Sequence, residues 1–453
     1  MNPLFDVYFN ALKDKRIVVL GLGVSNRPLV RLLLSYGCNV TGCDKTPREK
    51  LDADVLALEL LGCTLKSGEG YLEDLAADIV FRTPGMHPSN PALEKLRNDG
   101  AKVTSEMELF FELCPCKIIA VTGSDGKTTT TTLISELLKA AGKKVWLGGN
   151  IGTPLLPVCD QISTDDIAVV ELSSFQLMDM ERSANVAVVT NLAPNHLDVH
   201  KNMAEYIDAK KNIFKHQGTS DKLILNADNA ITADFQGNGI TRFFSRKKNT
   251  DIFMDGDAII RGGRVVLNKH DILIPGEHNV ENYMAAILAV EGLVTDDVIR
   301  RVAKTFGGVE HRIELVRVKD GVRFYNDSIA SSPSRTIAGL RSFKEKVILI
   351  AGGYDKHIPY DVLGPEICDH VKTVFVNGAT AMQIKTAIEK APQYAEGHPV
   401  IITCEDFTDA VLKAANSAVD GDVILMSPAS AAFDQFKNFM ERGKYFKKLV
   451  SEL

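Results

Sequence analysis

One short stretch of the chain restricts its possible folds more than any other. The apolar run Lys117–Val121 has the character of a buried strand and leads directly into Thr122–Thr128 (TGSDGKT), after which a helix is expected over Thr129–Leu138. In this context glycines let backbone N–H groups turn toward phosphate oxygens, and the helix N-terminus favours anions. Lys127 would supply a mobile positive charge, and the Thr128 hydroxyl could bind Mg²⁺. The spacing departs from GxxxxGK[ST], with valine at the first glycine position, so a glycine-rich turn with a surface lysine is the alternative.

Composition and charge agree with a large globular protein. The 453 residues suggest about three domains at roughly 150 residues each. Hydrophobic residues make up 45% and charged residues 24%, as in domains that bury sizeable cores. The 52 Lys and Arg against 58 Asp and Glu give a net charge of −6, which argues against partners such as nucleic acid or an anionic membrane. With no run of ~20 apolar residues, no signal-peptide pattern and no metal-type cysteine spacing, we expect a cytoplasmic protein.

Strand-like apolar runs alternate with helical patterns in three successive series, which predicts an α/β fold with three domains. Short alternating runs over residues 221–275 predict a small strand-rich insertion or side sheet. We expect a Rossmann-like domain over 1–113, a P-loop ATPase-like domain with a small extra sheet over 114–308, and a Rossmann-like domain over 309–453. The runs are 16–20, 39–43 and 78–81; 117–121, 167–170 and 186–189; and 322–325, 347–350, 374–376 and 423–426.

A second glycine-rich turn follows the first strand. Gly21–Asn26 (GLGVSN) is similar to GxGxxG, but Asn26 stands at the third glycine position. Asp44 ends the next strand, near the place where a ribose-binding acid belongs. The pattern indicates a nucleotide or dinucleotide at the first helix N-terminus, and a tight strand-to-helix turn without a ligand is the alternative.

Two further polar elements follow strands of the central series. Glu171 comes directly after the run 167–170, where a carboxylate could hold the Mg²⁺ of bound ATP; a helix-starting acid is the alternative. The segment 191–198 (NLAPNHLD) follows the run 186–189 and places His196 at the same edge. The predicted helix 203–216 then carries Lys210 and Lys211. Taken alone, such a histidine is more often structural, and such a lysine pair usually lies on a solvated helix face.

The third series has two turns in comparable positions. Asn326–Ser328 closes the strand 322–325, and Ala351–Lys356 closes the strand 347–350. Because ligands of open α/β sheets gather outside the carboxyl ends of the strands, both turns are candidates for nucleotide or substrate contacts. A ligand held by two domains at once would imply domain closure.

Together these elements resemble the Mur ligase family over nearly the whole chain. The phosphate loop, Thr122–Thr128, and the NxxxxH element, Asn191–His196, are shared across that superfamily. ELSSFQL and the DQFKNFxxRG ending are more specific to its D-glutamate-adding branch. The matching elements are GSDGKTTT at 123–130, ELSSFQL at 171–177, NLAPNHLD at 191–198, PGEHNVEN at 275–282, EHRIELV at 310–316, YNDSIASSP at 325–333, AGGYDK at 351–356 and SPASAAFDQFKNFMERG at 427–443.

The resemblance implies an ATP-dependent acid–amino-acid ligase. Its N-terminal domain would bind the UDP moiety, its central domain ATP and Mg²⁺, and its C-terminal domain would close over them and help bind D-glutamate. The implied reaction joins D-glutamate to UDP-N-acetylmuramoyl-L-alanine through an acyl phosphate, in peptidoglycan precursor synthesis. We expect the enzyme to act as a monomer in the cytoplasm, with no nucleic-acid or membrane partner.

The resemblance also assigns roles to single positions. Thr128 and Glu171 match ligands of a first Mg²⁺, and His196 and Lys210 match a second site in which the lysine is carried as an N-carbamate. Lys127, His196 and Lys210 would be the catalytic residues. The positions matched to ATP binding are Gly123, Ser124, Asp125, Gly126, Lys127, Thr128, Thr129, Asn282, Arg312 and Asp327. Those matched to substrate binding are Gly21, Val24, Ser25, Asp44, Lys45, Asn150, Ser331, Lys356 and Phe439.

Two positions depart from the family pattern where the C-terminal domain would meet D-glutamate. Ile329 stands where the family often has lysine, and Ala432 where it commonly has serine. Three other functions stay open: a superfamily ligase with a different amino acid or a folate acceptor, a nicotinamide-dependent oxidoreductase built on the first glycine turn, and a non-catalytic nucleotide-binding module. The oxidoreductase leaves the phosphate loop unexplained. Assaying ATP turnover with a panel of acceptors separates the ligases from the binding module, and binding of NAD without binding of ATP would favour the oxidoreductase.

Overall fold

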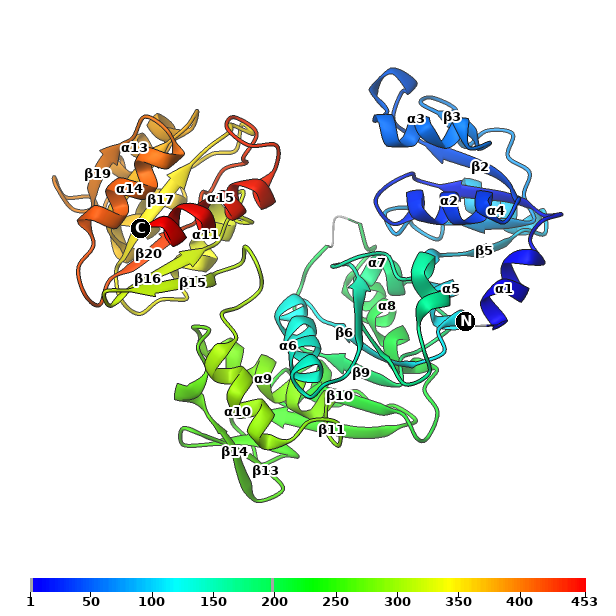
Figure 1. Cartoon of the computed structure of the whole chain (residues 1–453), viewed down its shortest axis with the longest axis horizontal. Coiled ribbons are helices and arrows are strands. Elements are labelled where there is room, and N and C mark those ends of the chain that lie inside the picture. The colour runs from blue at the N-terminus through cyan, green and yellow to red at the C-terminus, as the bar shows by residue number, and fades with distance from the viewer. Residues whose placement is uncertain (1–2, 197–198) are drawn as a thin grey trace. The chain divides into compact units, whose positions relative to one another are not determined.

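The computed structural model describes residues 3–196 and 199–453, and it contains three β-sheets with helices between the strands (Figure 1). Leu197 and Asp198, the end of the predicted NLAPNHLD element, lie outside the described residues. The chain divides into two compact units, described here one at a time. The first comprises Met1–Lys269 and Glu281–Val302, and the second His270–Val280 and Ala303–Leu453.

The first sheet is the Rossmann-like sheet predicted for the N-terminal region. Its five strands are all parallel, in the order β3-β2-β1-β4-β5, as expected where helices form the crossovers. The strands are β1 (Arg16–Leu20), β2 (Asn39–Asp44), β3 (Thr64–Ser67), β4 (Ile79–Phe81) and β5 (Lys102–Thr104). The helices are α1 (Pro3–Asn10), α2 (Asn26–Ser35), α3 (Ala53–Leu60), α4 (Pro91–Asn98) and α5 (Glu106–Leu113).

The second sheet has nine strands in the order β14-β13-β12-β11-β10-β9-β6-β8-β7. The segment 221–275 is strand-rich as predicted, but it does not form a separate side sheet. It extends the central sheet, because β10 pairs in parallel with β9, β11 with β10, and β12 with β11. The pairings of β12 with β13 and of β13 with β14 are then antiparallel. The strands are β6 (Lys117–Thr122), β7 (Val145–Gly149), β8 (Ile167–Glu171), β9 (Val186–Val189), β10 (Lys222–Asn226), β11 (Ile240–Ser245), β12 (Ile252–Asp255), β13 (Ala258–Arg261) and β14 (Arg264–Asn268).

The helices of the central region are α6 (Lys127–Ala140), α7 (Ser174–Leu177), α8 (Met203–Lys215), α9 (Glu277–Ala289) and α10 (Asp296–Thr305). Short 3₁₀ turns occur at Arg48–Lys50, Leu156–Gln161, Thr232–Asp234 and Lys269–Asp271. The first and second sheets share one hydrophobic cluster, which contains Phe9, Phe110 and Leu156 among many others. The N-terminal and central regions therefore pack as one body within the first unit.

The third sheet lies in the second unit and has six strands in the order β15-β16-β20-β17-β18-β19. Only β15 is antiparallel, at the edge of an otherwise parallel Rossmann-like sheet. The strands are β15 (Glu314–Lys319), β16 (Val322–Asn326), β17 (Val347–Gly352), β18 (Val371–Asn377), β19 (Val400–Thr403) and β20 (Val423–Met426). The helices are α11 (Pro333–Leu340), α12 (Leu363–His370), α13 (Ala381–Glu389), α14 (Phe407–Ser417) and α15 (Phe439–Glu452).

The register of the central sheet brings its polar loops to one edge. Strand β6 is buried from Ile118 onward and lies between β8 and β9. Val121 pairs with Glu171, and Thr122 pairs with Val189. The loops that follow these three strands therefore leave the sheet side by side.

Within the described residues, we find no helix with both the length and the apolar character needed to cross a bilayer.

Candidate functional site

The phosphate loop connects β6 to α6 in the way the sequence predicts. Gly123 has φ 150° and Gly126 has φ 75°, and both conformations disfavour other residues. Added Cβ atoms would also collide, with the Thr190 side chain at Gly123 and with Asn282 at Gly126. Lys127 Nζ donates to the carbonyl oxygens of Gly123 and Ser124, both at 2.9 Å, so the ammonium lies directly against the loop.

The loop after β9 holds the phosphate loop in place. Ser124 N–H donates to the Asn191 carbonyl at 2.9 Å, and Asp125 N–H donates to Asn191 Oδ1 at 3.0 Å. The Thr190 hydroxyl donates to the Asp125 carbonyl at 2.6 Å. The NLAPNH element therefore shapes the phosphate loop as well as carrying His196, a role that the sequence pattern did not indicate.

Helix α6 presents Thr128 and Thr129 in its first turn, next to the loop. At the next residue, the Thr130 hydroxyl donates to Asn282 Oδ1 at 3.2 Å, which joins α6 to α9. The structure thus brings the predicted nucleotide-binding residue Asn282 to the phosphate loop, although it is 152 residues away along the chain.

Glu171 ends β8 with its carboxylate buried beside this loop. Glu171 is 1% exposed, and its Oε1 accepts a hydrogen bond from Asn150 Nδ2 at 2.7 Å. The other oxygen, Oε2, is buried and has no hydrogen-bond partner among the residues that the structure describes. A buried carboxylate oxygen without a partner is costly unless a cation or a donor occupies the adjacent space. Glu171 therefore fits the predicted role of Mg²⁺ ligand, and Asn150 orients it.

Lys210 is buried and 2% exposed, so the alternative that it lies on a solvated helix face is wrong. Its Nζ donates to the Thr122 hydroxyl at 3.1 Å and to the Gly123 carbonyl at 2.9 Å. Burial, together with the charge of Lys127, holds the pKa of Lys210 well below its ordinary value, while Glu171 opposes the shift. Lys211, by contrast, pairs with Asp208 at 3.6 Å on the surface.

His196 lies at the same edge, in a left-handed backbone conformation with φ 55°. Its ring is 5.1 Å from the ring of Phe175, and the residue is exposed. Among the described residues, no hydrogen bond or ion pair joins His196 to Lys210, and no group of three or more His, Cys, Asp or Glu side chains forms a metal site. The second metal site is therefore a proposal that depends on modified Lys210.

Buried Tyr206 connects the phosphate loop to Lys210, and no sequence pattern indicated this role. Its hydroxyl is 2.9 Å from the Ser124 hydroxyl of the phosphate loop. Its ring faces Lys210 Nζ at 4.9 Å. His200, which is also buried, contacts the Tyr206 ring edge-on and stacks on Phe175 at 5.4 Å.

In the N-terminal sheet, the turn after β1 is closed by Asn26. Its side-chain amide donates to the carbonyls of Leu20 and Gly21 at 3.1 and 2.9 Å, which explains asparagine at the third glycine position. Asp44 accepts from Leu22 N–H and Thr46 N–H at 2.8 and 2.9 Å.

Burial favours a higher pKa for Asp44, but these backbone hydrogen bonds outweigh it and lower the pKa. Asp44 therefore remains ionised and holds the turn through its hydrogen bond from Leu22 N–H. Of the other predicted substrate residues, Val24 in this turn and Lys45 after β2 are exposed, and Ser25 is half-buried.

In the second unit, Asp327 lies buried between two loops. Its Oδ2 accepts from the Ser427 hydroxyl at 2.7 Å, and its Oδ1 accepts from Ile313 N–H at 3.3 Å. Arg442, also buried, donates to the carbonyls of Ser328 and Ser430 at 2.9 and 3.1 Å. The DQFKNFMERG ending thus supplies the arginine that joins these loops.

The remaining predicted residues of this unit lie around the same loops. Phe439 begins α15 and contacts the ring of His311 at 6.0 Å, while Ser331 is half-buried and bonds to the Ile329 carbonyl. Arg312 and Lys356 are both exposed.

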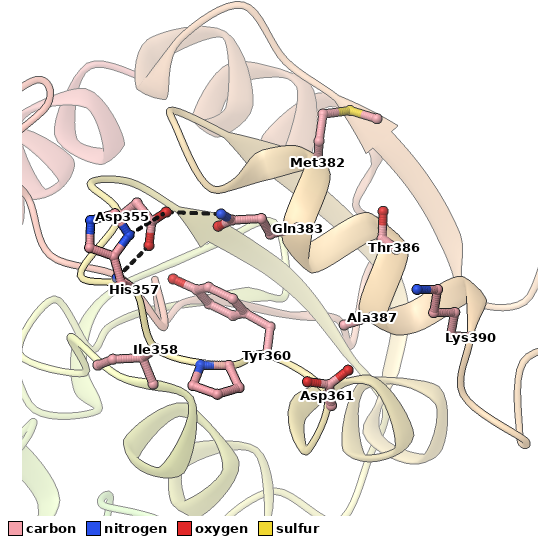
Figure 2. A pocket seen from close by; sticks show the side chains of 11 residues that line it. Asp355, His357, Ile358, Tyr360, Asp361, Met382, Gln383, Thr386, Ala387 and Lys390 are labelled. Atoms are coloured by element: carbon pink, nitrogen blue, oxygen red, sulfur yellow. Dashed lines mark hydrogen bonds and ion pairs between the residues drawn. The ribbon is translucent and has the colours of Figure 1, made fainter.

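The loop that carries Lys356 borders a cavity of about 520 Å³ that no sequence pattern indicated. Figure 2 shows Asp355 linked to His357 and to Gln383, with Met382, Thr386 and Lys390 following one another along α13 and its end. The Asp355 carboxylate accepts from Gln383 Nε2 at 2.9 Å and from His357 N–H at 2.6 Å. These bonds fix the loop on which Lys356 stands.

We expect Asp327→Asn to change the pH dependence of stability. Burial raises the pKa of Asp327 to about 7, against the opposing hydrogen bonds from Ser427 and Ile313. An unfolded aspartate has a pKa of about 3.9, so this group's contribution to the free energy of unfolding falls as pH rises toward 7. Between pH 5 and pH 8, the free energy of unfolding of Asp327→Asn should therefore rise relative to that of wild type by on the order of 3 kcal/mol.

Denaturant unfolding of the two proteins across this pH range measures the gain. Asp361→Asn, at an exposed position of the same unit, is the matched control and should leave the wild-type pH profile unchanged. Parallel pH profiles for Asp327→Asn and wild type would contradict the assignment.

Comparison with known proteins gives a consistent result. The family model "Mur ligase middle domain" matches residues 121–290, and "Mur ligase, glutamate ligase domain" matches residues 311–430. The UDP-N-acetylmuramoylalanine–D-glutamate ligase of Acetivibrio thermocellus is 51% identical, with 100% of both chains covered.

Two solved structures share the fold at 18% identity. The UDP-N-acetylmuramate-alanine ligase of Thermotoga maritima aligns with a TM-score of 0.57, over 97% of this chain and 99% of that one. A UDP-N-acetylmuramoyl-L-alanyl-D-glutamate–2,6-diaminopimelate ligase aligns with a TM-score of 0.58, over 84% and 93%.

Proposed function

The chain belongs to the Mur ligase family, and we propose that it ligates D-glutamate to UDP-N-acetylmuramoyl-L-alanine with consumption of ATP, in peptidoglycan precursor synthesis. The full-length similarity to proteins named for this activity supports the choice of substrates. The observation that carries the chemistry is the phosphate loop, whose Lys127 lies on the same sheet edge as the partly unpaired carboxylate of Glu171. Eight free thiols, most of them buried, agree with a reducing compartment such as the cytoplasm.

The reaction requires activation of a carboxylate. A carboxylate is a poor acyl donor for an amine, so transfer of the γ-phosphoryl group of ATP to it forms an acyl phosphate. The amine of D-glutamate then attacks, and phosphate leaves the tetrahedral intermediate. In this scheme the N–H groups at the start of α6 hold the phosphates, and the Lys127 ammonium neutralises charge that develops on the transferring group.

Thr128 and Glu171 would hold Mg²⁺ at the phosphate loop, in agreement with the unpaired Glu171 Oε2. Bound there, the ion would supply positive charge that screens the ATP phosphates from the incoming carboxylate. A second Mg²⁺ site would comprise His196 and N-carbamylated Lys210. The buried amine of Lys210 fits this modification, because its lowered pKa favours the neutral form that reacts with CO₂.

We assign the two remaining regions by the same proposal. The turn at Gly21, with Val24, Ser25, Asp44 and Lys45, would receive the UDP diphosphate. In the second unit, the residues that would contact ATP or D-glutamate are Arg312, Asp327, Ser331, Lys356 and Phe439. The domain limits 1–113, 114–308 and 309–453 follow this division of labour.

The amino acid that the enzyme adds identifies its branch of the family. We expect ADP and phosphate release with UDP-N-acetylmuramoyl-L-alanine and D-glutamate, and a rate at least about 100-fold lower with L-glutamate, glycine, L-alanine or L-lysine, because a site built for polar groups rejects analogues that leave them unpaired. Coupled ATP turnover with each amino acid measures this. Preferred turnover with another amino acid, or with a folate substrate, would place the chain in another branch.

A further inference from the structure

Arg82 is a buried arginine that the proposed chemistry does not use. It follows β4 directly, at the carboxyl edge of the N-terminal sheet, and is 1% exposed. A fully buried guanidinium is costly unless all of its donors find acceptors. Its partners therefore show what the residue holds together.

The partners of Arg82 come from both sheets of the first unit. On the N-terminal side, Nη1 donates to the carbonyls of Thr83 and Met86 at 3.2 and 2.8 Å. On the central side, Nη2 donates to the Phe175 carbonyl at 3.2 Å, and Nε donates to Asp179 Oδ2 at 3.2 Å. Asp179 Oδ1 also accepts from Nη2, so the guanidinium and the carboxylate form a bidentate ion pair.

Each side of this junction supports part of the proposed active site. A Cβ on Gly21 would collide with the Thr83 side chain, so the turn proposed for the diphosphate lies against the residue next to Arg82. Phe175 lies in α7, which starts three residues after Glu171, and its ring contacts His196.

A second link joins the same segment to the helix that carries Lys210. His87 Nε2 is 3.5 Å from Glu205 Oε1, and Glu205 lies in α8, as does Lys210. The N-terminal segment 82–87 is therefore held at one end by residues 175–179, which follow Glu171 in the chain, and at the other end by α8, which carries Lys210.

We propose that Arg82 is a positioning residue: it fixes the UDP-binding turn relative to Glu171 and Lys210, so that the substrate carboxylate meets the γ-phosphate. The proposal rests on the proposed function of the site. Because Arg82 is 1% exposed, its side chain is not accessible to either reactant, so its loss should leave binding of each substrate alone almost unchanged. Misplacement of bound reactants by about 1 Å costs on the order of 100-fold in rate, and we expect this effect in kcat.

The test compares Arg82→Met with Arg16→Met. Arg16 is an arginine of the same sheet whose ion pair with Asp78, at 2.9 Å, stays inside the N-terminal region. For Arg82→Met we expect kcat about 100-fold lower at saturating substrates, with calorimetric Kd values for the UDP substrate and for ATP within about threefold of wild type. Arg16→Met should keep wild-type kcat. Arg82→Lys should fall between, because an ammonium can pair with Asp179 but lacks the planar fork.

Hydrogen exchange provides a readout that does not depend on activity. Without substrates, backbone amides of residues 83–87 and 175–179 should exchange faster in Arg82→Met and at wild-type rates in Arg16→Met. If Arg82→Met does not fold, Asp179→Asn replaces it, because Arg82 then keeps its carbonyl partners and loses only the charged one.

Wild-type kcat in a folded Arg82 variant, or a loss explained entirely by weaker binding of one substrate, would overturn the positioning role. Unchanged exchange in both segments would overturn it as well. If wild-type protein showed no ligation at all, the proposed function would fail, and the exchange result would still decide whether Arg82 couples the two sheets.

Discussion

Lys127→Ala is expected to reduce ligation by at least about 1,000-fold while the protein remains folded. The lysine stands in the first turn of α6, and its Nζ lies 2.9 Å from two carbonyl oxygens of the phosphate loop. From this position the ammonium can turn toward a phosphate, and no other residue of the loop carries positive charge. Loss of one preorganised group that stabilises developing charge typically costs 100- to 1,000-fold, and Lys127 also holds the loop itself.

The measurement is coupled ADP release, with thermal unfolding and ATP binding measured in parallel. Lys139→Ala is the matched control, because Lys139 lies on the same helix and pairs with Glu136 on the surface, at 2.9 Å. It should retain wild-type turnover. Near-normal ligation by folded Lys127→Ala would contradict the phosphate-loop assignment, and an unfolded variant would instead indicate that the lysine mainly maintains the loop.

The central part of the fold could be predicted from short-range signals. The runs 118–121, 167–170 and 186–189 are continuously apolar because their strands are covered on both faces, and each is followed by polar residues where the sheet ends. Parallel strands place all such ends at one edge. This geometry brings Lys127 and Glu171 to the same edge without any knowledge of the long-range contacts.

The path of residues 221–275 could not be predicted in the same way. Alternating apolar residues indicate that strands exist, but strand pairing depends on neighbours far along the chain. The parallel pairing of Leu223 with Ala187 extends the central sheet, and nothing local to either residue specifies that partner.

The residues that hold the site residues in place, such as Tyr206 and Ser427, could not be predicted from the sequence either. Tyr206 reaches Ser124 across 82 residues, and Ser427 reaches Asp327 across 100. A tyrosine on an apolar helix face and a serine after a strand are common core features, so their types carry no functional signal. Arg82 is more informative, because an arginine directly after a buried strand needs acceptors, although the sequence does not name them.

Lys210→Ala is expected to lose most ligation activity, at least about 100-fold, because the proposed second metal site would lose an oxygen ligand. An ammonium would repel Mg²⁺, so this lysine can serve the site only after its amine is deprotonated and bonded to CO₂. The structure provides the condition for that step. The amine is buried, its pKa is lowered by burial and by Lys127, and its present partners are a hydroxyl and a carbonyl.

Lys211→Ala is the matched control, because Lys211 is adjacent on α8 but lies on the surface, with Asp208 as its ion-pair partner. It should keep wild-type turnover. Adding a short carboxylate such as formate or acetate to Lys210→Ala should restore part of the activity, since the small anion can supply the missing oxygen ligand. The same addition should not affect Lys211→Ala.

The modification itself can be observed without an activity assay. With ¹³C-labelled bicarbonate, a carbamate carbon signal should appear in the NMR spectrum of wild type and of Lys211→Ala, and it should be missing from Lys210→Ala. Wild-type turnover should also fall when bicarbonate is removed and recover when it is returned. If Lys210→Ala retains near-wild-type ligation at low bicarbonate, the carbamate role is wrong. The buried amine would then serve only to hold Thr122 and Gly123 in the phosphate loop, and other groups must bind any second metal ion.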